Sequence, residues 1–183
     1  MIARTQQVFT TDELTALLGL DPKKDKRRVI KFAESREYNI VPSIKLASGS
    51  GSRRLYDLEN VCQFALALRL LETGLRSHVI GKVIRQLPKK GKLSAKLEMS
   101  GFELQELKIV IVREPEPGSP LNKPRNQVVS FQKSGEDLTE FVAKTFCKPS
   151  NRFDMILIPI GQTFYELKGQ LYQHRQKWAQ ENL

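Results

Sequence analysis

Cationic side chains gather in one short stretch of the chain, and their chemistry suits phosphate groups. They are Lys23, Lys24, Arg27, Arg28 and Lys31. At about 100° per residue, a helix places all of them in one arc, while apolar residues such as Val29 and Phe32 fill the opposite arc. Lysine and arginine on such a face can neutralise nucleic-acid phosphates, although many charged helix faces are only solvated surface.

The distribution of charge favours phosphate binding. The 183 residues carry 30 Lys and Arg against 20 Asp and Glu, a net charge of +10. Up to Lys92 the cations outnumber the acids by 18 to 9, whereas beyond it they number 12 against 11. A basic half beside a nearly neutral half is typical of a nucleic-acid-binding part joined to a part with another task. An anionic membrane is the other candidate polyanion, but it needs an amphipathic helix with exposed bulky apolar residues or a lipid anchor, and the sequence shows neither.

The element that precedes these cations is a short helix, predicted over residues 11–18. Thr10 can cap its first turn, and Glu13 completes a capping box three residues later. Gly19 stands where a helix ends with positive φ. We therefore expect the chain to turn sharply there.

A second helix is predicted directly after that turn. Asp21 offers an N-cap, and Pro22 fits the first helical position, where its missing N–H costs nothing. Two helices joined so closely predict a helix-turn-helix. The second helix would carry the cations into the major groove of DNA, with base contacts nearest its N-terminal half.

A glycine- and serine-rich tip follows, flanked by two short extended runs. The runs are 43–47 and 53–56, and the tip is 48–52. That order predicts a β-hairpin, or wing, although an ordinary flexible loop has a similar composition. Arg53, Arg54 and Tyr56 lie on the second run, where guanidinium groups and a hydroxyl can bind the sugar-phosphate backbone.

Two amphipathic helices are predicted after the wing. Asp57 can cap the first, which ends before Gly74, and Ser77 can cap the second, which ends before Pro88. Both have a continuous apolar stripe, so we expect them to form the scaffold on which the helix-turn-helix packs.

Four stretches of this half carry a family resemblance. They are residues 9–19, Arg53-Arg54-Leu55-Tyr56-Asp57, 70–75 and 80–84. Together they resemble the DNA-binding domain of MerR-family transcriptional regulators, over roughly the first ninety residues. The resemblance implies a winged helix-turn-helix, a double-stranded DNA partner and a homodimer. The family's long coiled-coil helix has no obvious counterpart here, because Pro88, Gly91 and Gly101 interrupt the region where it would run.

The second half predicts a small α/β domain with about three strands and two helices. The strands are expected at 107–112, 127–132 and 153–160, and the helices at 135–146 and 163–182. A proline-rich loop at 114–126 joins the first two strands, either as a contact segment or as a connector.

The last predicted helix has an apolar stripe along one face. Its members recur at intervals of three and four residues and are Phe164, Leu167, Leu171, His174 and Trp178. We expect this stripe to pack on the sheet of its own domain, with a dimer contact as the alternative.

Nothing in the sequence forms a catalytic or metal-binding pattern. It has no phosphate loop, no glycine-rich dinucleotide turn and no metal-spaced cluster of His or Cys. The histidines are His78 and His174, and the cysteines, Cys62 and Cys147, lie far apart. We therefore expect no enzyme, no metal and no cofactor, and we interpret Cys62 and His78 as packing or surface residues. The two cysteines are isolated, and the sequence shows neither an apolar run long enough to cross a bilayer nor a signal peptide. These features predict a cytoplasmic protein, bacterial or phage in style.

These expectations combine into an α+β fold with a winged helix-turn-helix of four helices and a hairpin at 1–90, a connector at 91–106 and an α/β domain at 107–183. The predicted function is a sequence-specific transcriptional regulator that binds double-stranded DNA as a homodimer. Its predicted DNA-binding residues are Lys23, Lys24, Arg27, Arg28, Lys31, Arg53, Arg54 and Tyr56. The second domain would serve self-association, sensing, or contact with RNA polymerase or another protein. The alternatives are an architectural or segregation DNA-binding protein, a phage excision factor, and a protein-interaction adaptor that does not bind DNA.

Overall fold

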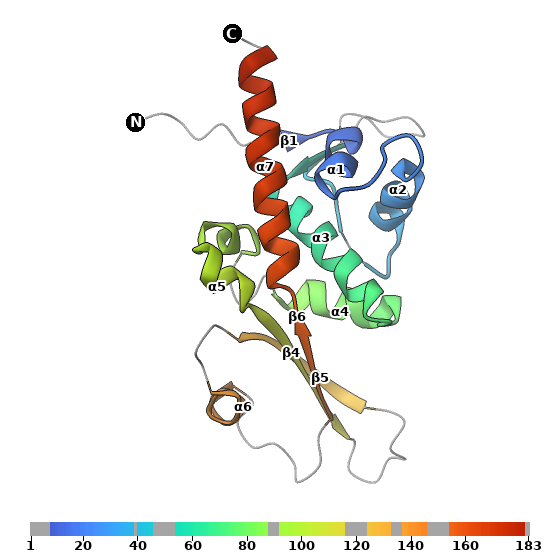
Figure 1. The fold of residues 1–183 in the computed structure, drawn as a ribbon. Coiled ribbons are helices and arrows are strands. Elements are labelled where there is room, and N and C mark those ends of the chain that lie inside the picture. Colours follow the sequence, from blue (N-terminus) through green and yellow to red (C-terminus); the bar gives the residue numbers. More distant parts are fainter. Residues whose placement is uncertain are drawn as a thin grey trace.

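The structure is a computed structural model, and its described part combines helices with two antiparallel sheets in an elongated molecule (Figure 1). It describes residues 8–38, 40–45, 54–87, 92–115, 124–132, 137–145 and 154–181. One sheet and the first helices lie at one end, and the second sheet lies at the other. The predicted α+β class is confirmed. No helix within the described ranges is both long enough and apolar enough to cross a membrane.

The first sheet contains the pairing that the wing requires. Its elements are β1 (Val8–Phe9), β2 (Ile44–Lys45) and β3 (Arg54–Asp57), in the order β1-β3-β2. β2 and β3 are antiparallel, with Ile44 opposite Leu55 and Lys45 opposite Arg54. The two flanking strands of the predicted hairpin are therefore paired, and the tip at 48–52 lies outside the described residues.

The first helix, α1 (Thr11–Leu17), forms as its capping signals predict. The Thr10 hydroxyl accepts a hydrogen bond from the Glu13 backbone N–H, and a Glu13 carboxylate oxygen accepts one from the Thr10 backbone N–H at 2.7 Å. Gly19 has a φ of +69°, which ends the helix in the left-handed region. Both local predictions are confirmed.

The second helix, α2 (Lys26–Glu34), starts four residues later than predicted. The Asp21 carboxylate accepts the Lys23 backbone N–H at 2.8 Å, and the Asp25 carboxylate accepts the Asp21 N–H at 3.1 Å. Asp21 thus closes a separate turn instead of capping the helix, as Asp side chains often do. The prediction for Asp21 and Pro22 was wrong in this respect, and Lys23 and Lys24 lie in the turn ahead of α2.

The scaffold helices are α3 (Leu58–Glu72) and α4 (Ser77–Gln86). Asp57 caps α3 by accepting the Asn60 backbone N–H at 2.8 Å, as predicted. The cap predicted at Ser77 was wrong, because the residue at the N-cap is Arg76 and it makes no side-chain cap hydrogen bond. α3 lies at the centre of the molecule, with both α4 and the C-terminal helix against it.

The predicted connector at 91–106 contains helical turns. They are the 3-10 helix η2 (Ser94–Glu98) and α5 (Gly101–Gln105). The Glu59 carboxylate on α3 accepts the backbone N–H groups of Leu93 and Ser94, each at 2.9 Å. Leu93 and Leu104 are fully buried. This segment is therefore anchored to α3 and is part of the core.

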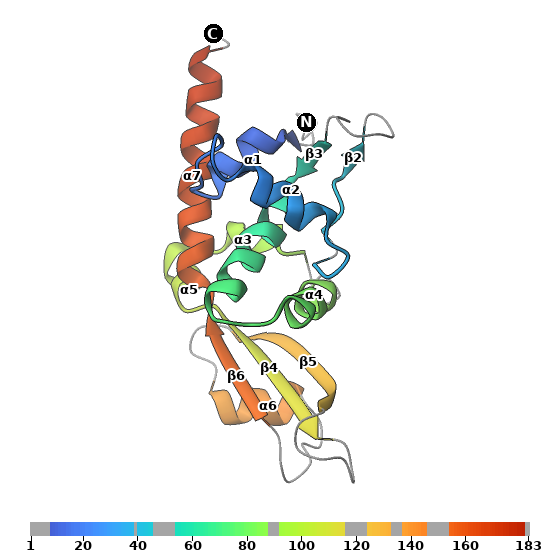
Figure 2. The same cartoon turned by 90° about the vertical axis from the view of Figure 1, so that its right-hand side faces the viewer.

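The second sheet follows the predicted order of elements closely. They are β4 (Lys108–Pro115), β5 (Pro124–Gln132), α6 (Leu138–Thr145), β6 (Asp154–Pro159) and α7 (Gly161–Glu181). β4 lies in the middle, antiparallel to both neighbours. Val110 and Val112 pack with Phe141 and Val142 of α6, whereas the alternate residues of β4 face the main core. Figure 2 shows α6 beside the sheet, away from α3.

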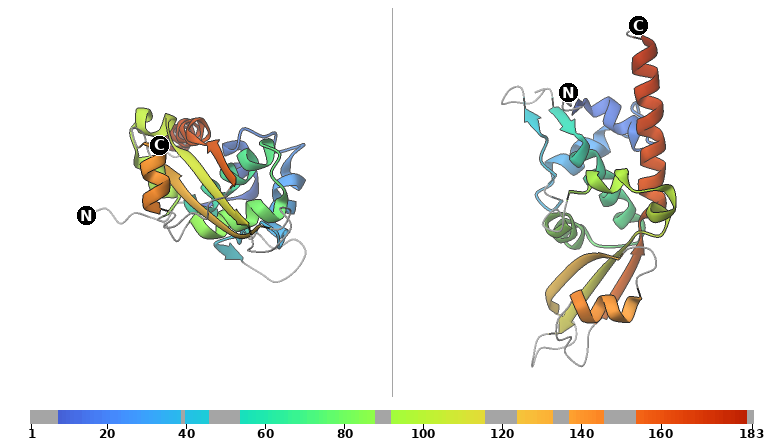
Figure 3. Two further views of the ribbon diagram at one scale, coloured as in Figure 1. Left: turned by 90° about the horizontal axis from the view of Figure 1, so that it is seen from below. Right: turned by 90° about the vertical axis from the view of Figure 1, so that its left-hand side faces the viewer.

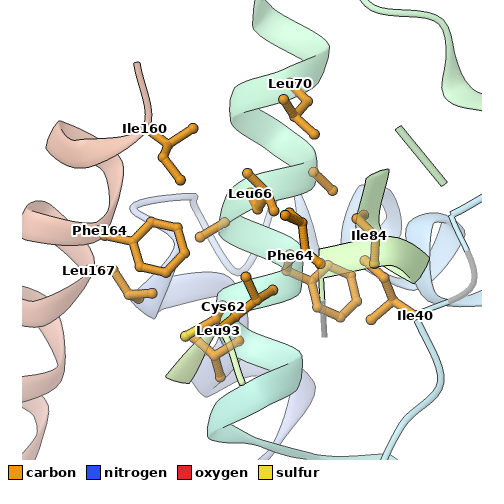
Figure 4. Packing of buried hydrophobic residues seen from close by; sticks show 14 of the residues in the cluster. Ile40, Cys62, Phe64, Leu66, Leu70, Ile84, Leu93, Ile160, Phe164 and Leu167 are labelled. Atoms are coloured by element: carbon orange, nitrogen blue, oxygen red, sulfur yellow. The ribbon is translucent and has the colours of Figure 1, made fainter. Parts of the chain in front are cut away.

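The C-terminal helix α7 does not pack on its own sheet as predicted. It leaves β6 and runs back along α3 and past α1 (Figure 3). Figure 4 shows Phe164 and Leu167 of α7 directed toward α3, where Cys62 and Leu66 lie. The apolar stripe is therefore buried as far as Leu171 by the helix-turn-helix half, while its last member, Trp178, is 62% exposed.

A continuous cluster of buried residues links the two halves of the chain. It extends from Phe9 to Leu171 and includes Leu107 and Ile109 from the start of the second half. The domain boundaries at residues 90 and 106 stay a prediction. Although α7 comes from the C-terminal half of the sequence, its buried residues pack in the core of the N-terminal half.

Candidate nucleic-acid interface

The cationic residues near α2 all have exposed side chains. This holds for Lys23, Lys24, Arg27, Arg28 and Lys31. Val29 and Phe32, on the opposite face, are 2% and 7% exposed. The helix is thus attached through its apolar face and presents its cations to solvent, which is the arrangement that a recognition helix needs.

Contacts at both ends hold α2 in place. Near the start, Lys26 Nζ lies 2.8 Å from the Asp12 carboxylate of α1. Near the end, the Phe32 ring stacks on Tyr38, with 4.4 Å between ring centroids. Lys26 was not among the predicted site residues, and the structure gives it this positioning contact with Asp12.

The remaining cations differ in how much of their charge is already paired. Lys24 Nζ is 3.8 Å from the Asp21 carboxylate, a weak and exposed contact. Within the described part of the chain, no acidic group lies at ion-pair distance from Arg27 or Lys31. These two residues are four apart and therefore lie above one another on the helix surface. Like the exposed Arg28, which also has no acidic group at that distance, they are available to an external anion.

Arg54 of the predicted wing contacts the end of α2. Its Nη2 lies 2.5 Å from Glu34 Oε1, and the Arg54 side chain is 20% exposed. The hydrogen bond to Glu34 raises the pKa of Arg54, so the guanidinium stays charged. Arg53, its predicted neighbour in the site, lies outside the described residues. The structure therefore brings one arginine of the predicted wing to the end of α2.

Tyr56 is a correction to the predicted set. Its side chain is fully buried and packs edge-to-face on Phe64, with 5.6 Å between ring centroids. Tyr56 lies opposite Phe9 on the central strand of the sheet, where its side chain belongs to the core. Burial raises the pKa of its phenol, while Thr11 and Arg54 oppose that shift. A side chain in this position cannot reach a phosphate, and we remove it from the interface.

Asn60 holds the chain ahead of β2, where the predicted wing begins, and this role was not among the sequence-based predictions. This residue of α3 is 7% exposed, and its Oδ1 accepts hydrogen bonds from the Ser43 backbone N–H and hydroxyl at 3.1 and 2.7 Å. Its Nδ2 donates to the Val41 carbonyl at 3.0 Å. The sequence does contain a signal for this role, since Asn60 is an amide within an apolar helix. A buried amide requires specific hydrogen-bond partners, so its position predicts a structural contact.

A second cationic face lies on α4 and was also missed. Lys82 and Arg85 are exposed and three residues apart, so they share one side of the helix, and the exposed His78 lies one turn before Lys82 on that side. α4 is close to the segment after α2, since a Cβ added at Gly81 would lie 1.6 Å from the Glu37 carbonyl oxygen. Figure 2 shows α2 between β2 and α4, so the cationic elements are neighbours.

Cys62 is the cysteine within the described ranges. Cys62 is buried in α3, and burial raises the pKa of its thiol, which keeps it neutral. No group of three or more His, Cys, Asp or Glu residues suited to a metal ion occurs among the residues that the structure describes. Cys147 lies outside them.

Comparison with known proteins gives a partial likeness. No model of a protein family matches the chain. Over 52 residues it is 40% identical to uncharacterized HTH-type transcriptional regulators of Mycobacterium bovis and of two strains of Mycobacterium tuberculosis. The match covers 28% of this chain and 23% of each relative. The chain thus spans less than a quarter of the length of the curated relatives it matches.

Proposed function

We propose that this chain is a helix-turn-helix transcriptional regulator that binds double-stranded DNA sequence-specifically, through a winged domain of the MerR type. The observation that carries the proposal is the solvent-facing cationic side of α2, fixed by Lys26 to α1 and by Glu34 to β3. The partial likeness to HTH-type transcriptional regulators supports it. Binding, and not catalysis, is the proposed activity.

Each cationic element has its own role in the proposal. Arg27, in the first turns of α2, reads a base edge in the major groove, and Lys31 binds the adjoining phosphate. Lys23, Lys24 and Arg28 contact DNA near the start of the helix. Arg53 and Arg54 hold the backbone beside the groove, and the cationic face of α4 adds phosphate contacts on the other side of α2.

The proposed active form is a homodimer, because one short recognition helix reads only part of a helical turn and a symmetric pair reads an inverted repeat. The second sheet and α6 are left for contact with RNA polymerase or another protein. Sedimentation of the full chain with and without a DNA site tests the dimer, and a monomer in both conditions would contradict it.

The direct test of DNA binding is a titration of a labelled duplex at several salt concentrations, read by fluorescence anisotropy. Each phosphate contact contributes about 0.9 to the slope of log affinity against log salt. The double variant Arg27→Gln with Lys31→Gln should lower both affinity and slope. The matched control, Lys108→Gln with Lys177→Gln, removes the same charge from β4 and α7. Equal losses of affinity and slope in both variants would show a nonspecific charge effect and contradict the proposed interface.

A further inference from the structure

A cavity of about 280 Å³ lies between the end of α1, the outer side of α3 and the first turns of α7. Its apolar walls are residues 17–20, Ala65, Leu68 and Leu167, and Arg28 of α2 borders it. Ligand cavities in proteins usually measure about 300–1,000 Å³. This one lies just below that range, so it suits only a small molecule.

The charged groups around the cavity balance one another, but one arginine among them has no acidic partner in the described part of the chain. Arg69 lies 3.4 Å from Glu72, and Glu166 brings a second carboxylate. Arg28 has no acidic group at ion-pair distance in the described part of the chain. Two arginines and two glutamates leave no net positive charge for a polyphosphate, but Arg28 remains available to one anionic group.

The start of α7 supports the same sign of charge. Thr163, in the first turn of this 21-residue helix, also borders the cavity. The N-terminus of a helix carries a partial positive charge and favours an anion nearby. Arg28 and the start of α7 therefore place two positive features on a cavity whose apolar lining is mostly leucine and whose polar lining includes Glu72 and Glu166.

We propose that this cavity binds a small monocarboxylic acid, with the carboxylate on Arg28 and the apolar body against Leu68 and the corner at residues 17–20. Its regulatory consequence rests on the proposed function, because Arg28 also belongs to the DNA-facing helix. A carboxylate paired with Arg28 competes with a DNA phosphate. The ligand then weakens DNA binding, and DNA weakens ligand binding by the same factor.

The ligand site is tested on the full chain without DNA. Hexanoate is titrated into the ¹⁵N-labelled protein at millimolar concentrations, with neutral hexanamide as the matched compound and benzoate as a second acid. We expect saturable NMR shifts at the cavity residues of α1, α3 and α7, and affinity for hexanamide lower by about tenfold, since a charge-assisted hydrogen bond is lost. No saturable shifts there with either acid, or equal binding of hexanamide, would overturn the site.

Variants show whether hexanoate binds in the cavity or is attracted by positive charge in general. Arg28→Gln should lose most of the hexanoate affinity, whereas Arg27→Gln, which removes a neighbouring cation outside the cavity, should keep it. Leu68→Asp places a carboxylate in the apolar wall and should also abolish binding. Hexanoate binding that survives Arg28→Gln would overturn the assigned role of that residue.

The effect of hexanoate on DNA affinity is measured in a separate experiment. Saturating hexanoate should lower the DNA affinity of the wild type but not of Leu68→Asp. An unchanged wild-type affinity would refute the competition even if hexanoate binds. Failure of the wild type to bind any DNA would instead refute the proposed function, and the ligand titration would still decide whether the cavity is a site.

Discussion

Arg54 of β3 and Glu34, the last residue of α2, form an ion pair with Nη2 and Oε1 2.5 Å apart. The pair joins the strand of the proposed wing to the proposed recognition helix. It also keeps the Arg54 guanidinium partly occupied, so in the proposed complex a DNA phosphate competes with Glu34 for it. The acid at the end of α2 therefore limits the positive charge that the interface presents.

Glu34→Gln should strengthen DNA binding. The substitution removes a negative charge beside the groove and frees Arg54 for a phosphate, which adds about 0.9 to the salt slope. Anisotropy titrations over a range of salt measure both quantities. Glu37→Gln removes a nearby exposed acid with no arginine partner in the described residues and serves as the control. The same increase in slope for both variants would contradict the role of the ion pair.

Arg54→Ala should weaken binding to all duplexes alike and lower the salt slope by about one. Because the Glu34 side chain is 58% exposed, the loss of the ion pair should reduce the free energy of unfolding by less than about 1 kcal/mol. Urea denaturation checks the stability, and titration against several unrelated sequences checks the uniformity. An unchanged slope would remove Arg54 from the interface.

Gly81→Ala should destabilise the protein because the backbone after α2 leaves no room for a methyl group. The added Cβ would meet the Glu37 carbonyl oxygen at 1.6 Å, and such overpacking costs about 1–3 kcal/mol. Gly169→Ala on α7 is the matched change, since its Cβ meets nothing within 4 Å and alanine favours a helix by up to about 1 kcal/mol. Urea midpoints should therefore move in opposite directions, and a neutral Gly81→Ala would contradict the packing.

Asn60→Leu should lower the free energy of unfolding by about 1–3 kcal/mol, because it leaves the Ser43 N–H and the Val41 carbonyl without their partner. Gln173→Leu, which replaces an exposed amide on α7, is the matched control and should change stability by less than about 0.5 kcal/mol. Equal effects would mean that Asn60 does not hold the start of the wing.

The success of sequence-based prediction depended on how local each signal was. Thr10, Glu13 and Gly19 act within one helical turn, and they place α1 correctly. The order of β4, β5, α6, β6 and α7 also follows from local periodicity. Long-range contacts decide the rest. Nothing in the spacing of Phe164 and its neighbours shows that α3, and not the adjacent sheet, covers that stripe.

The candidate site shows the same limit. Exposure of the α2 cations follows from their helical arc, because the apolar arc must face the core. Tyr56 was misplaced because its strand is central in the sheet, which a hairpin pattern alone does not reveal. The start of α2 was misplaced because Asp21 can cap either a helix or a tight turn, and its bond to the Lys23 N–H decides for the turn.

Cys62 should resist alkylation in the folded protein. Burial between α3 and α7 raises its pKa, whereas an unfolded thiol ionises at about pH 8.5. The stability that comes from burying the neutral thiol is complete below that pH and decreases as the pH rises above it. Iodoacetamide at about pH 8 should therefore modify Cys62 only in denaturant, as read by peptide mass spectrometry. Equal rates in the folded and denatured protein would contradict its burial.

The most direct test of the central claim is selection from randomised duplex DNA by the full-length protein at physiological salt, carried out in parallel with Arg27→Ala. The account predicts an enriched sequence motif for the wild type, with an inverted repeat if the chain is dimeric, and a relaxed preference at one base pair for Arg27→Ala, worth about 1–3 kcal/mol. Lys31→Ala should keep the motif and bind it more weakly. DNA retained without any motif would favour an architectural protein, and no retained DNA would contradict DNA binding altogether.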